Sequence, residues 1–85
     1  MLTDNKLKEN AKILEPVIRI GKNGLTESTI KEIKKQLNKK KLVKVKLLRA
    51  FVEGKDKKLV ADKIAEETNS RLIDLVGFVV VLYKG

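Results

Sequence analysis

The stretch VIRIGKNGLT, residues 17–26, decides the fold of this chain because it joins a strand to the start of a helix. Its first four residues are β-branched or basic, which is typical of a short strand. Thr26 is a favourable helix N-cap, and Leu25 and Ile30 have the spacing of a hydrophobic staple. We therefore expect a strand-to-helix loop made of Gly21, Lys22, Asn23 and Gly24.

This G-x-x-G loop has the composition of a phosphate-binding turn. Glycine has no Cβ, so a sugar-phosphate backbone can approach closely, and the helix that follows points free N–H groups outward. The pattern alone is weak, since glycines at such corners usually serve only to turn the chain. Between Lys31 and Arg49, however, nine basic residues stand against one acid, Glu32. The combination indicates a polyanion ligand, and RNA is the best candidate.

Length and charge indicate a single folded domain with an uneven distribution of positive charge. Its 85 residues form one domain, residues 1–85, and 42% hydrophobic content favours a folded chain despite 36% charged residues. The net charge of +9 is carried entirely by residues 1–49, while residues 50–85 are neutral. Such asymmetry is typical of nucleic-acid binders. The alternative is a solvated, lysine-rich surface helix without a ligand.

The chain lacks the residues that several kinds of site require. The chain has neither cysteine nor histidine, so disulfides, thiolate metal sites and the usual general base are absent. No acidic pair or nucleophile has a spacing that links it to the loop. The longest apolar run, from Phe78 to Tyr83, has the length of a strand. We expect a cytoplasmic protein with no membrane segment, metal, cofactor, small-molecule substrate or catalytic activity.

The hydrophobic pattern predicts seven elements. A helix over residues 3–15 buries Leu7, Ala11 and Leu14 and stops before Pro16. The strand over 17–20 leads to a helix over 26–39. We expect this helix to bury Ile30, Ile33 and Leu37. Its outer side chains include Lys31, Lys34, Lys35 and Asn38.

Residues 42–48 alternate, which predicts a strand with Lys44 and Lys46 on a wet face. A helix over 56–67 and strands over 71–76 and 78–83 follow, and the apolar last strand should be central. The order α-β-α-β-α-β-β predicts an α/β two-layer sandwich, with a four-stranded mixed sheet and its helices packed on one face.

Three blocks of the sequence resemble the CRM domain (chloroplast RNA splicing and ribosome maturation) in its short stand-alone bacterial and archaeal form. They are residues 17–26, 42–48 and 76–84, and the likeness spans nearly the whole chain in the same order. The resemblance implies a fold like the C-terminal domain of translation initiation factor three. Two positions depart from the family pattern: Asp74 stands where a Gln is frequent, and Lys84 where an Arg is usual.

The resemblance also implies RNA binding without catalysis. Stand-alone bacterial members associate with precursors of the large ribosomal subunit, and plant members assist group II intron splicing. The family's loop falls on Gly21, Lys22, Asn23 and Gly24, and its basic helix falls on the face with Lys31, Lys34 and Lys35. We therefore expect a monomer that binds ribosomal RNA or a pre-ribosomal particle, with Lys44 and Lys46 extending the contact across the sheet.

Two other functions fit the charge. One is an archaeal chromatin-type architectural protein that binds DNA or RNA, although the short segment Val76-Gly77-Phe78 leaves no room for a hairpin arm. The other is an interaction protein whose basic face docks on an acidic partner. The chain has few aromatic residues for stacking on bases, so recognition should depend on backbone shape and 2′-hydroxyls.

Overall fold

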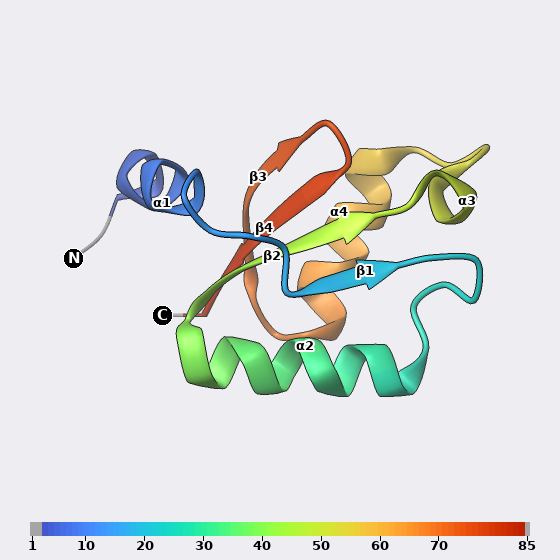
Figure 1. Ribbon diagram of the computed structural model, residues 1–85, viewed down its shortest axis with the longest axis horizontal. Helices are drawn as coiled ribbons and strands as arrows, with labels where there is room; N and C mark the ends of the chain where they lie inside the picture. Colours follow the sequence, from blue (N-terminus) through green and yellow to red (C-terminus); the bar gives the residue numbers. More distant parts are fainter. Residues whose placement is uncertain (1–2, 85) are drawn as a thin grey trace.

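The computed structural model describes residues 3–84, so positions 1, 2 and 85 of the expected domain lie outside the described residues. The elements are α1 (Asp4–Ala11), β1 (Ile18–Ile20), α2 (Glu27–Lys40), β2 (Leu42–Leu47), α3 (Arg49–Val52), α4 (Lys57–Glu67), β3 (Arg71–Val76) and β4 (Val79–Tyr83). The strands form one mixed sheet in the order β1-β2-β4-β3 (Figure 1). The predicted α/β class and four-stranded mixed sheet are confirmed.

The sheet register follows from the sequence pattern. β1 and β2 are parallel and are connected by α2, whereas β4 is antiparallel to both β2 and β3. The apolar run of β4 therefore occupies the central position that its composition predicted. Along β2, Val43, Val45 and Leu47 are buried, while Lys46 is exposed on the opposite face.

The main core lies between the sheet and the two long helices. Ile33 and Leu37 of α2 and Ile64 of α4 are fully buried against Val45 and Leu82 of the sheet. Thr26 caps α2 as expected, because its Oγ1 accepts a hydrogen bond from the N–H of Thr29 at 3.2 Å. These contacts fix α2 and its lysines relative to β1 and the loop.

The expectation that all helices pack on one face does not hold for α1. Leu7 and Ala11 of α1 form a separate small core with Ile73 and Val81, on the face opposite α2 and α4. Ile73 lies at a bulge between Leu72 and Asp74 in β3 and has no paired residue on β4. The apolar stripe of a helix shows that it packs on something, but it does not show which face of a sheet it covers.

One helix boundary and one additional helix also differ from the sequence expectation. α1 ends at Ala11 instead of continuing to residue 15, and Leu14 is 37% exposed rather than buried. The chain must leave the helix here in order to reach β1. The short helix α3 was not predicted, since four residues are too few to show a helical period.

Candidate nucleic-acid interface

The G-x-x-G loop forms a tight turn between β1 and α2, on the right of Figure 1. The N–H of Gly24 donates to the carbonyl of Gly21 at 2.9 Å, and the N–H of Thr26 donates to the carbonyl of Gly24 at 3.1 Å. Gly24 has a φ of +73°, a conformation that other residues rarely adopt. Lys22 and Asn23 lie at the exposed tip of the turn.

The helix that the sequence did not reveal, α3, packs directly against this loop. A Cβ atom built on Gly21 would lie 3.3 Å from Cδ1 of Leu48, and one on Gly24 would lie 3.4 Å from Cε1 of Phe51. The N–H of Leu48 also donates to the carbonyl of Ile20 at 2.8 Å. The two glycines therefore allow close packing of the loop against Leu48 and against Phe51 of α3.

Substitution of Gly24 by Ala is expected to destabilise the protein and to weaken nucleic-acid binding several-fold. The left-handed backbone should cost about 1–2 kcal/mol of unfolding free energy, measured by chemical denaturation. Gly54→Ala is the matched control, because Gly54 has a φ of +76° and a Cβ atom added there would have nothing within 4 Å. Both variants should lose similar stability, but only Gly24→Ala should lose affinity. Equal affinity in both variants would show that the loop conformation does not matter for binding.

A hollow of about 260 Å³ lies beside the loop and has the donors that a phosphate requires. Arg19, Lys22 and Asn23 line it together with Thr26 and Thr29 at the start of α2. Within the described residues, the backbone N–H groups of Glu27 and Ser28 donate to no protein acceptor, as expected at a helix N-terminus. The cationic side chains of Arg19 and Lys22 and the positive end of the α2 dipole favour an anion in the hollow.

Arg19 is a candidate site residue that the sequence reasoning missed. It is exposed on β1, its neighbour Ile20 is buried, and its Cα is paired with that of Lys46 on β2. The alternation of side chains along β1 could have revealed it, because Arg19 is next to the buried Ile20 and must therefore face the other side of the sheet. Arg19 and Lys46 thus place two cations on the sheet beside the loop.

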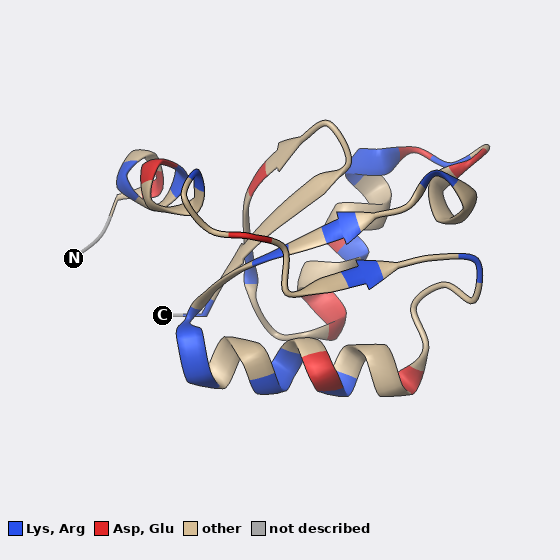
Figure 2. Cartoon of the chain, viewed as in Figure 1, with Lys and Arg blue, Asp and Glu red and all other residues tan. Residues whose placement is uncertain are grey.

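The predicted lysines of α2 line one basic surface along the helix, which Figure 2 shows as blue segments interrupted by acidic and uncharged ones. Lys31 and Lys35 are exposed, Lys34 is half-buried, and all three line one shallow hollow together with Asn38 and Lys39. This surface lies opposite Ile33 and Leu37, which are fully buried. Loss of the lysine charges therefore leaves the core untouched.

The two predicted lysines of β2 have different environments. Lys46 is exposed beside Arg19. Lys44 is half-buried, and its Nζ donates a hydrogen bond of 3.0 Å to the carbonyl of Leu14 in the segment after α1. The ammonium group of Lys44 is thus already engaged with the backbone, and its contact with a ligand stays a prediction.

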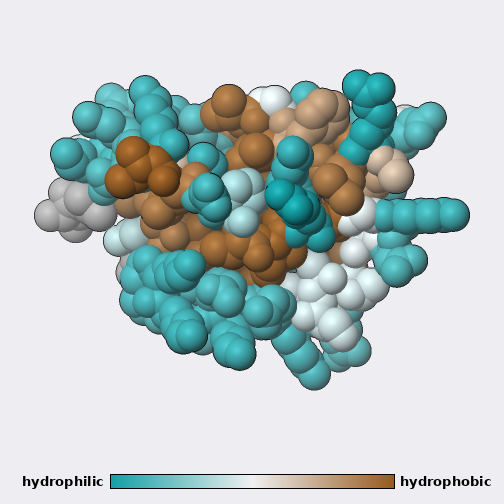
Figure 3. All heavy atoms as spheres, viewed as in Figure 1, coloured by the Kyte–Doolittle hydropathy of each residue, from teal (hydrophilic) through white to brown (hydrophobic). Residues whose placement is uncertain are grey.

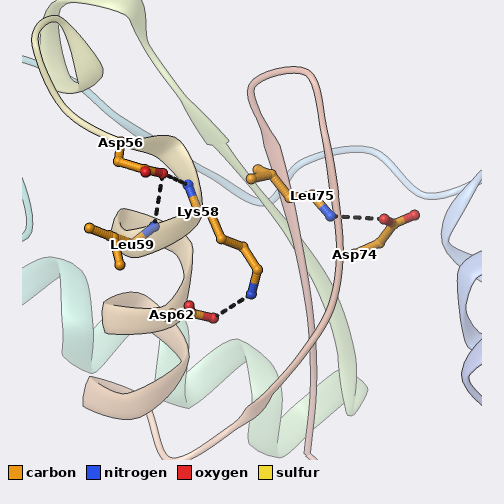
Figure 4. A network of polar contacts seen from close by, with 6 residues as sticks. All are labelled: Asp56, Lys58, Leu59, Asp62, Asp74 and Leu75. Carbon is orange, nitrogen blue, oxygen red and sulfur yellow. Dashed lines mark hydrogen bonds and ion pairs between the residues drawn. The ribbon is translucent and has the colours of Figure 1, made fainter.

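Acidic side chains near α4 and β3 have local structural partners (Figure 4). Asp56 caps α4 by accepting from the N–H groups of Lys58 and Leu59, and Asp62 pairs with Nζ of Lys58 at 2.9 Å. Asp74 accepts from the N–H of Leu75 at 2.9 Å. Among residues 3–84, no group of three acidic side chains is arranged to hold a metal ion, and no helix is long and apolar enough to cross a membrane.

Comparison with known proteins identifies the family. A model of the CRS1 / YhbY (CRM) domain matches residues 3–84. The chain belongs to this family, which confirms the resemblance seen in its sequence.

Relatives in bacteria and archaea cover nearly the whole chain. A probable RNA-binding protein of Methanocaldococcus jannaschii is 37% identical over 78 residues, which is 92% of this chain and 58% of that protein. An RNA-binding protein of Haemophilus influenzae is 38% identical over 92% of this chain and 77% of its own length. A candidate RNA-binding protein of Staphylococcus aureus, solved in solution, has a TM-score of 0.81 at 34% identity and covers 100% of this chain and 90% of its own. The chain therefore spans little more than half of the archaeal relative.

Proposed function

We propose that this protein binds RNA without catalysis, and that its ligand is ribosomal RNA or a precursor of the large ribosomal subunit. The observation that carries the proposal is the hollow beside Gly21–Gly24, which is lined by Arg19 and Lys22 at the N-terminal end of α2, the helix whose lysines line a second hollow. Relatives named as RNA-binding proteins support the class of ligand. The ribosomal target rests on the family resemblance.

The binding mechanism is electrostatic. The loop hollow holds one phosphate through N–H groups and the Arg19 guanidinium, whose forked donors suit phosphate oxygens. Lys22, Lys31, Lys34 and Lys35 neutralise the phosphates that follow, and Lys46 contacts those over the sheet. Such contacts position RNA but read little sequence.

RNA affinity should fall steeply as salt concentration rises. Neutralisation of about four to six phosphates gives a slope of roughly −3 to −5 for the logarithm of the binding constant against the logarithm of salt concentration. Fluorescence anisotropy at a series of salt concentrations measures this slope. A flat salt response would exclude binding dominated by phosphate contacts. Crosslinking in cells, followed by sequencing of the bound RNA, tests the ribosomal target separately.

A further inference from the structure

An apolar groove of about 700 Å³ lies between the segment after α1 and the C-terminal end of α2. Its walls are formed mainly by Ile13, Leu14, Val17, Leu42 and Val43. Ile13 is 86% exposed and Leu14 is 37% exposed, so apolar side chains stand at its rim in contact with water. Its volume is in the range of small-ligand sites, which are concave and mostly apolar.

The groove is held open by the backbone. α1 ends at Ala11, and the chain then crosses towards β1 in place of continuing as a helix. Two hydrogen bonds fix the crossing segment to β2: Nζ of Lys44 donates to the carbonyl of Leu14 at 3.0 Å, and the N–H of Val17 donates to the carbonyl of Lys44 at 2.9 Å. A preformed groove of this kind needs little ordering when a ligand enters.

The groove continues the basic surface of α2. Lys31, Lys35 and Lys39 have i, i+4 spacing and form a ridge on the outer side of α2, whereas Lys40 stands three residues after the buried Leu37, on the side that turns towards the sheet. Lys39 lines the basic hollow of α2, and Lys40 lines the apolar groove. Figure 3 shows the brown apolar surface at the centre of this face, directly bordered by the hydrophilic side chains over α2. An RNA backbone that follows Lys31, Lys35 and Lys39 to the end of α2 comes next to Lys40, which borders the groove.

We propose that this groove receives an unpaired base of the RNA bound along α2, an inference that rests on the proposed function. The faces of a base are apolar and suit the aliphatic walls, whereas its edge carries polar groups that the side chain of Asn10, which also lines the groove, can bond. The position beside Lys40 keeps the attached phosphate near a cation. A second copy of this protein is disfavoured as occupant, because each copy carries a net charge of +9.

The test compares two RNA hairpins of equal length, one with a single bulged 2-aminopurine and one with that base paired. The protein should bind the bulged hairpin roughly fivefold more tightly, since burial of one base face against aliphatic side chains has about this effect. The fluorescence of the bulged base should change on binding, and that of the paired base should not. The double variant Ile13→Ser/Leu14→Ser should lose both differences and still bind the paired hairpin with unchanged salt dependence.

Two further variants control this result. Ile13→Ser alone, at a position that is 86% exposed, leaves the fold unaffected and should reduce the preference in part. Leu59→Ser on α4, where Leu59 is 68% exposed, should leave the preference for the bulged hairpin unchanged.

Equal affinity of the natural protein for both hairpins would overturn the base-binding groove but not RNA binding. Failure to bind either hairpin at low salt would overturn the proposed function itself. Capture of a protein by a photocrosslinker at position 13 after nuclease treatment, with no bulge preference, would assign the groove to a protein partner and also overturn the proposal.

Discussion

Replacement of both Lys22 and Asn23 by Asp is expected to weaken RNA binding about a hundredfold while the fold stays intact. Two carboxylates in the loop would lie close to the phosphate that we place in the hollow. If each costs about 1.4 kcal/mol, which lies between the limits for charges about 4 Å apart in water and near a protein surface, the two together reduce affinity by this factor. Both side chains are exposed, so stability should change by no more than about 0.5 kcal/mol.

The control must produce the same change in net charge away from the loop. Lys57 and Lys58 are unsuitable, because Lys57 donates to the carbonyl of Gly77 and lies over the ring of Phe78, and Lys58 pairs with Asp62. Lys63→Asp with Asn5→Asp uses two exposed positions instead. Anisotropy titrations at one salt concentration compare the two double variants. If both lose equal affinity, the loop is only a turn and long-range charge explains the loss.

Conversion of Lys31, Lys34 and Lys35 to Gln should weaken binding by roughly a hundredfold at 0.1 M salt, by a similar factor for every RNA tested. Each lost phosphate contact reduces the salt slope by about 0.7 to 0.9, so the slope should become shallower by about two to three units. Circular dichroism should show an unchanged fold, because these side chains point away from Ile33 and Leu37.

Variants that remove lysine charges elsewhere serve as controls for the triple Gln variant of α2. Lys6→Gln and Lys63→Gln change exposed positions on α1 and α4, and each should alter affinity much less per charge removed. An undiminished affinity in the well-folded triple variant would place the RNA on another face. A loss restricted to one RNA sequence would indicate base readout by the lysines, contrary to the phosphate model.

Much of the fold could be predicted from the sequence because its patterns are local. The G-x-x-G loop, the cap at Thr26 and the alternation of β2 are each determined by neighbouring residues, and each agrees with the structure. The central position of β4 followed from its uninterrupted apolar run. The predicted lysines of α2 likewise line one hollow because the helix period places them on the same side.

The features that escaped prediction depend on tertiary contacts. The role of Phe51 beside Gly24 becomes visible only when α3 folds against the loop. The bond between Lys44 and the carbonyl of Leu14 joins residues from different elements, so no local pattern reveals it. Arg19 is the exception, since the strand period already placed it opposite Ile20 and the loop that follows would have brought it to the site.

The separation of the two cores by the sheet has a consequence for motion. α1 contributes only two buried side chains, Leu7 and Ala11, to its small core. The ion pair between Asp4 of α1 and Arg71 lies at the surface, where such pairs contribute about 0–1 kcal/mol to stability. Local opening of α1 would therefore expose little apolar area and leave the packing of α2 and α4 undisturbed. The segment that carries Ile13 follows α1 and stays bound to β2 through the hydrogen bonds of Leu14 and Val17, so opening of α1 would remove Asn10 from the groove but leave its β2 wall and the G-x-x-G loop in place.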